Sequence, residues 1–200
     1  MAWIDTISPS DSEGNLKKIY KRLVGPEGNI DNILMVHSLR PHTLQGHMAL
    51  YKNVLHNTGN TLPKWFLEAI GVYVSIQNQC KYCVEHHFEG LKKLLNDDKE
   101  ANKIRAAFEA NKAVQVFDDK QLEAIKYAGK LTTSPGMVSK NDIKNLKKAG
   151  YNDGEILEIN QVISYFNYAN RTVSGLGVNT KGDVLGLSPG DSDEDNWEHK

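Results

Sequence analysis

Cys80 and Cys83 are the only two cysteines among the 200 residues of the chain, and they stand three positions apart. Random placement would give this spacing in roughly 1% of chains of this length, so the pair is informative. Residues three apart are neighbours on one face of a helix, so both sulfurs can lie together and close a disulfide. A reducing compartment disfavours structural disulfides, which leaves catalysis or metal binding as the chemistry of the pair.

The residues around the pair include groups that can activate a thiol. We take Asn78 as the cap of a helix whose first turn contains Cys80. The unpaired main-chain amides of that turn favour the thiolate. A free thiol with a pKa of about 8.5 is only a few per cent ionised at neutral pH, whereas a pKa of about 7 makes it half ionised. His87 follows Cys83 by four residues, so its imidazole lies on the same side of the helix and can accept the proton of that thiol.

Glu68 enters the predicted site through geometry. If the chain reverses at residues 78–79, two antiparallel helices result. At about 1.5 Å per residue, Glu68 lies roughly 14 Å from the turn and His87 roughly 11–12 Å. A carboxylate on an apolar, buried helix needs a partner, because an unpaired buried charge is very costly. We therefore expect Glu68 to orient His87, directly or through water, and to complete a Glu–His–Cys relay. His86 points to a different side of the helix and receives no role.

Each of these residues also has an ordinary structural interpretation. A lone buried glutamate is more often part of a structural ion pair, and a lone histidine more often lies on a helix surface or in the core. Together the four positions favour catalysis. Two alternatives from other classes stay open. One is a zinc site formed by Cys80, Cys83, His87 and perhaps Glu68, and the other is a non-catalytic oligomeric module whose cysteines only pack.

The elements that must position these residues all read as helices. Apolar residues recur at helical spacing, and the sequence contains no strand or tight-hairpin pattern. The most apolar helix begins at Thr61-Leu62-Pro63 and is expected to be central. Ser10-Asp11-Ser12-Glu13 predicts a capping box that opens the first helix, and Pro41 suits the first turn of another. Further helices are expected at about 98–112, 119–131 and 139–149, and from Ile156 to about Val173.

Composition indicates an ordinary globular protein. Hydrophobic residues make up 40% and charged residues 24%, close to the globular average. The formal net charge of -1, spread along the chain, argues against a nucleic-acid partner. The N-terminus is unlike a secretory signal, and no apolar stretch approaches the ~18 residues of a membrane span, so we expect no membrane partner and a cytoplasmic location. No glycine-rich nucleotide loop or haem signature is present, and no cofactor is expected.

The chain is expected to form a single all-α domain followed by a tail. Residues 1–181 contain the predicted helices. Residues 182–200 are rich in glycine, serine and acidic side chains, a composition typical of a flexible tail.

Glu68, the twelve-residue step to Cys80 and the pattern CKYCVEHH resemble the alkylhydroperoxidase D and carboxymuconolactone decarboxylase superfamily, in particular its peroxidase-related branch. The likeness covers most of residues 1–178. It implies an AhpD-like helical fold that assembles as a homo-oligomer, a trimer or hexamer. It also implies that Cys83 is oxidised to sulfenic acid, that Cys80 donates a proton and then closes the disulfide, and that His87 is the base, supported by Glu68.

The function that this resemblance implies is a thiol-dependent peroxidase. Such an enzyme reduces hydroperoxides through a dithiol–disulfide cycle and is restored by a dithiol or protein reductant. Tyr82 stands where well-studied alkylhydroperoxidases often have a second histidine, and a phenol of pKa about 10 does not relay protons near neutral pH as an imidazole does. A thiol–disulfide oxidoreductase acting on a partner protein is therefore the alternative. Lactone decarboxylation is not expected, because that branch generally lacks the cysteine pair.

Overall fold

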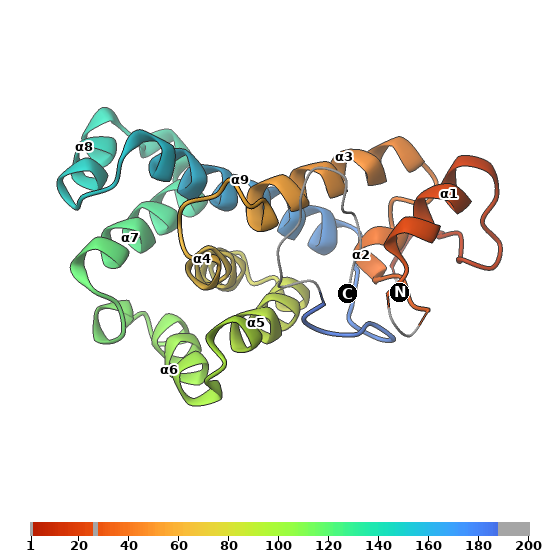
Figure 1. Ribbon diagram of the computed structural model, residues 1–200, viewed down its shortest axis with the longest axis horizontal. Coiled ribbons are helices and arrows are strands. Elements are labelled where there is room, and N and C mark those ends of the chain that lie inside the picture. Colours follow the sequence, from red (N-terminus) through yellow and green to blue (C-terminus); the bar gives the residue numbers. More distant parts are fainter. Residues whose placement is uncertain (1, 26–27, 188–200) are drawn as a thin grey trace.

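The computed structural model describes residues 2–25 and 28–187, whose regular elements are all helical (Figure 1). The predicted all-α fold is confirmed. None of these helices is long and apolar enough to cross a membrane. A π-helical turn, η1, continues α3, and two short 3-10 turns, η2 and η3, follow α6 and α7. The elements are α1 (Gly14–Leu23), α2 (Asn32–Met35), α3 (Pro41–Tyr51), η1 (Lys52–His56), α4 (Lys64–Gln77), α5 (Lys81–Leu95), α6 (Asp98–Glu109), η2 (Ala113–Gln115), α7 (Asp119–Thr133), η3 (Pro135–Met137), α8 (Lys140–Lys148) and α9 (Asp153–Gly175).

Helix α4 is the centre of the fold. It packs against α5, α6, α7 and α9, and Figure 1 shows it nearly end-on with these helices around it. Its side chains are buried without a gap from Phe66 to Ser75, as the apolar composition of the segment predicted. At Gly71 the ring of Phe166 from α9 lies so close that any side chain would collide with it. This glycine sets how closely α9 approaches α4.

Several helix starts follow the predicted signals. Helix α3 begins at Pro41, whose fixed φ and missing N–H suit a first turn. Helix α4 begins directly after Pro63. Helix α9 begins three residues earlier than Ile156, behind a capping box formed by Asn152 and Glu155. The main predicted helices therefore exist, with ends shifted by a few residues.

The capping box predicted at residues 10–13 is wrong. Helix α1 begins at Gly14, and the side chain of its N-cap, Glu13, makes no capping hydrogen bond. Gly14 has a φ of +52°, a left-handed conformation that a helix opening at residue 10 would not contain. Ser8 and Asp11 instead form a separate turn, in which the Ser8 hydroxyl donates to Asp11 Oδ2 at 2.6 Å.

After α9 the chain returns to the start of α5 as a short irregular segment, residues 178–187, which we call the strap. The side chain of Asn32 in α2 donates to the carbonyls of Asn179 (2.8 Å) and Lys181 (3.0 Å). Further along, Lys93 of α5 donates to the carbonyl of Gly186 at 2.6 Å. The strap thus includes residues 182–187 of the segment predicted to be a flexible tail. The remainder of that segment, residues 188–200, lies outside the described residues.

Candidate active site

The two cysteines lie where α4 ends and α5 begins. Gln79 has a φ of +56°, and its N–H donates to the carbonyl of Ile76 (3.0 Å). The Cys80 N–H donates to the carbonyl of Ser75 (2.9 Å). These two bonds form a Schellman motif, which ends α4 and reverses the chain as predicted. Asn78, however, is the C-cap of α4 and does not cap the next helix, because Cys80 itself is the N-cap of α5.

The two sulfurs form one hydrogen-bonded pair. Both thiols are free and each residue is 2% exposed. Hydrogen bonds to the Cys80 sulfur, above all from the Cys83 thiol and also from the Ser174 hydroxyl, lower the pKa of Cys80 to about 7. The same thiol–thiol bond, together with burial, raises the pKa of Cys83 well above its ordinary value. When the pair has lost one proton, the negative charge lies on Cys80 and the remaining proton on Cys83.

This charge distribution differs from the expected one, in which His87 takes the proton of Cys83. The difference comes partly from α9, which was not predicted to contribute to the site. Ser174 hydrogen-bonds Cys80, and Asn170, four residues earlier on the same face, hydrogen-bonds Cys83. Asn170 is 1% exposed on a largely apolar helix, and a buried amide in such a place was the available sequence signal.

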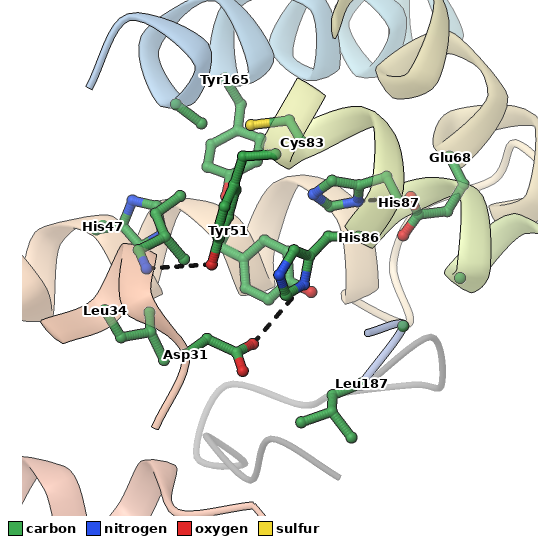
Figure 2. A pocket seen from close by; sticks show the side chains of 15 residues that line it. Asp31, Leu34, His47, Tyr51, Glu68, Cys83, His86, His87, Tyr165 and Leu187 are labelled. Carbon is green, nitrogen blue, oxygen red and sulfur yellow. Dashed lines mark hydrogen bonds and ion pairs between the residues drawn. The ribbon is translucent and has the colours of Figure 1, made fainter. Parts of the chain in front are cut away.

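Glu68 and His87 are in direct contact, as predicted. Glu68 is 4% exposed on α4, and Nδ1 of His87 on α5 lies 2.8 Å from its Oε2. An ionised carboxylate only accepts hydrogen bonds, so Nδ1 carries the proton in this pair. Figure 2 shows the other ring nitrogen turned away from Glu68, toward the side where Cys83 and Tyr165 lie. The imidazole thus presents a free basic nitrogen to the site.

Cys83, Glu68 and His87 line one small cavity together with aromatic residues that include Tyr51 and Tyr165. The cavity offers about 40 Å³ to the centres of water-sized molecules. One water needs about 10–15 Å³ by this measure, so a few fit. Of the two cysteines, only Cys83 belongs to the lining. A small reactant in the cavity therefore meets Cys83 first, and Cys80 lies behind it.

His86, which was predicted to point to a different side of the helix and to have no role, also lines this cavity. Its Nε2 lies 3.2 Å from Oδ2 of Asp183, and its Nδ1 lies 4.0 Å from Oδ2 of Asp31. Tyr82 stacks on the imidazole with ring centroids 4.4 Å apart and donates its hydroxyl to Asp183 at 2.6 Å. Burial and the charge of Asp183 raise the pKa of Tyr82 well above its ordinary value, so the phenol stays a donor.

The zinc alternative requires Cys80, Cys83, His87 and Glu68 to converge on one point. Across residues 2–25 and 28–187, no three histidine, cysteine, aspartate or glutamate side chains are grouped so as to hold a metal ion. The four side chains instead form two separate pairs, one between the sulfurs and one between the imidazole and the carboxylate.

Solved structures share this fold. An alkylhydroperoxidase AhpD core structure, that of an uncharacterized peroxidase-related protein from Ralstonia eutropha JMP134, is similar with a TM-score of 0.77 and 20% identity over 90% of this chain and 92% of that one. An uncharacterized peroxidase-related protein from Silicibacter sp. TM1040 is similar with a TM-score of 0.71 and 23% identity, over 90% of this chain and 92% of that one. The debrominase Bmp8 is similar with a TM-score of 0.71 and 17% identity, over 88% of this chain and 91% of that one. No protein-family model and no curated protein matches the sequence. The chain has the AhpD-like fold that the resemblance implied.

Proposed function

We propose that the protein is a thiol-dependent peroxidase that reduces small hydroperoxides through a dithiol–disulfide cycle of Cys80 and Cys83. One observation carries the proposal. The Cys83 thiol, hydrogen-bonded to the Cys80 thiolate, forms part of the wall of a cavity that admits a few water-sized molecules. A reactant that oxidises a sulfur in such a place has to be small, and a hydroperoxide is. The peroxidase-related proteins of the same fold support this choice.

The first chemical step uses the inequality of the two sulfurs. As a hydroperoxide enters, Cys83 passes its proton along the existing hydrogen bond to Cys80, and the Cys83 sulfur attacks the terminal peroxide oxygen. A sulfur–oxygen bond forms while the oxygen–oxygen bond breaks, and the alcohol leaves once its oxygen receives a proton. Cys83 is oxidised by two electrons to the sulfenic acid, and the hydroperoxide is reduced.

The second step closes the disulfide. The free nitrogen of His87 takes the proton of Cys80, whose sulfur attacks that of Cys83; a sulfur–sulfur bond forms, the sulfur–oxygen bond breaks, and the proton leaves with the hydroxide as water. Glu68 accepts the hydrogen bond from Nδ1 and so stabilises the imidazolium between these events. An external dithiol or dithiol protein then reduces the disulfide and restores both thiols.

A thiol–disulfide oxidoreductase acting on a partner protein remains the alternative. A protein disulfide would have to reach Cys80 or Cys83, each 2% exposed, so the cavity would first have to open. The neighbour Bmp8 is a debrominase that has been crystallised with 2,3,4-tribromopyrrole. We favour the hydroperoxide because two of the similar structures are those of peroxidase-related proteins.

The remaining partners are proposals as well. The resemblance implies a trimer or hexamer, and the chain exposes large apolar side chains suited to such contacts, including Val114 (68%), Met137 (70%) and Leu157 (60%). Multi-angle light scattering of the full chain measures the assembly directly, and a monomeric mass contradicts this proposal.

Hydroperoxide consumption by the purified full chain tests the function. With dithiothreitol as reductant, we expect turnover of hydrogen peroxide and tert-butyl hydroperoxide, and its loss in Cys83→Ser. With the reductant left out, Cys80→Ser should consume at most one equivalent and accumulate a sulfenic acid that dimedone captures, because the resolving sulfur is gone. Glu109→Gln, at an exposed ion pair of α6, is the control. Unchanged turnover in Cys83→Ser rejects the proposal.

A further inference from the structure

We infer that His86, held between the carboxylates of Asp183 and Asp31, is the acid that protonates the leaving oxygen of the substrate. The inference rests on the proposed function and supplies the proton that its first step requires. In that step the proton of Cys83 moves to Cys80, which does not line the cavity, so neither sulfur can deliver a proton to the departing alkoxide. An alkoxide is strongly basic, and its release beside buried carboxylates is costly unless it is protonated as the oxygen–oxygen bond breaks.

The other polar groups of the cavity are less suited to this task. The Nδ1 proton of His87 is donated to Glu68, and its other nitrogen serves as the base of the second step. Burial raises the pKa of Tyr51 and of Tyr165 well above the ordinary value, so these phenols hold their protons too tightly. No lysine or arginine of the described chain lines the cavity. His47 also lines the cavity, where its ring lies among those of His37, Tyr51 and Tyr165. His86, by contrast, lies beside the carboxylates of Asp183 and Asp31, so it is the imidazole that we assign as the acid.

Asp183 fixes one side of the imidazole. Its carboxylate is buried, with 1% of its side chain exposed, and accepts from the Tyr82 hydroxyl (2.6 Å) and from the Asn32 main-chain N–H (3.1 and 3.2 Å). These partners are both donors, so the carboxylate acts as an acceptor and the Nε2 of His86, 3.2 Å away, carries a proton. The stacked ring of Tyr82 restricts rotation of the imidazole.

Asp31 faces the opposite side of the ring at a longer distance. Its Oδ2 lies 4.0 Å from Nδ1 of His86, too far for a hydrogen bond, and both residues line the cavity (Figure 2). The inferred acid is the doubly protonated imidazole of His86, with its second proton on Nδ1, on the side of Asp31. That proton is attracted by Asp31 without being donated to it. It is therefore free for an oxygen atom that enters from the cavity.

The strap has the contacts needed to keep Asp183 in this place. Gly186 has a φ of +69°, and its Cα lies against the main chain of Glu89 and Gly90, where a Cβ would be 2.9 Å from a carbonyl carbon. Lys93 holds the carbonyl of the same glycine. One face of α5 thus contacts the strap through residues on successive turns, and the same helix carries His86.

Two oxidants that differ in their leaving group test the inference. Tert-butyl hydroperoxide releases a strongly basic alkoxide, which needs an acid, whereas peracetic acid releases acetate, which does not. In single-turnover oxidation of the thiols, His86→Gln should slow the reaction with tert-butyl hydroperoxide by about 100-fold or more and that with peracetic acid by less than about threefold. Asp31→Asn, which leaves the Asp183 contact intact, should change the ratio of the two rates in the same direction.

Alkylation of the thiols by iodoacetamide is the control for structural damage, because it involves no leaving oxygen. We expect an unchanged rate in His86→Gln. The inference is overturned if His86→Gln, with normal alkylation, reacts equally slowly with both oxidants. It is also overturned if the variant reacts with both at the rate of the unaltered chain. If His86→Gln does not fold, the ratio in Asp31→Asn decides. Failure of the unaltered chain to react with either oxidant rejects the proposed function itself, and the inference with it.

Discussion

The thiol of Cys83 donates to the sulfur of Cys80, which makes two chemically identical residues unequal. The lowered pKa of one sulfur and the raised pKa of the other arise from the same bond. Such a coupled pair loses its first proton as a unit and holds the second far more tightly. Above pH 7 the pair therefore holds its thiolate on Cys80, behind the cysteine that lines the cavity.

The alkylation rate of the dithiol should depend on pH with a midpoint near 7. A pKa of Cys80 lowered to about 7 means that the thiolate is present above that pH and is lost as the pH falls below it. Cys83→Ala removes the largest cause of the lowering, so the midpoint should move upward toward the value of a free thiol. Cys83→Ser keeps a hydroxyl donor and should lie between the two. Thiolate absorbance and iodoacetamide rates measure these midpoints, and an unmoved midpoint in Cys83→Ala contradicts the assignment.

Glu68→Gln should slow disulfide closure more than sulfenic acid formation. The amide keeps the size of the side chain but loses the negative charge that stabilises the His87 imidazolium. We expect closure to slow by about 100-fold, within the range of general acid–base effects. Rapid-mixing experiments with dimedone capture separate the two steps. Glu109→Gln, at an exposed ion pair of α6, is the matched control and should leave both steps unchanged.

Gly71→Ala should destabilise the protein, and Gly46→Ala should not. A Cβ at Gly71 collides with the ring of Phe166, and overpacking of this kind costs about 1–3 kcal/mol. Gly46 lies on the exposed side of α3 with open space around it, where alanine should stabilise the helix by about 0.5–1 kcal/mol. Urea denaturation measures both changes. Equal effects of the two substitutions would show that α9 does not approach α4 at this glycine.

Gly186→Ala should loosen the strap without unfolding the helices. Alanine is strained at a φ of +69°, and its Cβ meets the main chain of Glu89 and Gly90. We expect faster hydrogen exchange in residues 179–187 and weaker discrimination between the two oxidants, because Asp183 is displaced from His86. Gly182→Ala is the comparison: it has an unfavourable φ of +89° but no close neighbour, so its effect should be smaller.

Local spacing was enough to predict much of the site. The step from Glu68 to the cysteines and the rise of two antiparallel helices bring this carboxylate to His87, and both helices are regular enough for such arithmetic to hold. The same reasoning failed for His86, because its partner Asp183 stands 97 residues away in a segment without helical periodicity. A long-range contact made by an irregular segment leaves no pattern in the local sequence.

The resting position of the charge was also beyond the sequence. When two cysteines on one helix face share a proton, either sulfur can keep it, and the spacing of the two residues does not show which one does. The choice depends on which sulfur also receives the Ser174 hydroxyl. It depends too on whether the N-cap of the helix is Cys80 or, as predicted, Asn78, and a difference of two residues lies within the usual uncertainty of a helix end.

The Schellman motif that ends α4 leaves no spare residue before α5, since Cys80 belongs to both. Each residue of a helix advances the direction of its side chains by about 100°. One amino acid inserted between Gln77 and Cys80 would either turn the whole of α5 by that angle or push the turn out of register. The length of this turn is therefore as much a part of the chemistry as the identity of the sulfurs, and natural variation in loop length has to occur elsewhere in the chain.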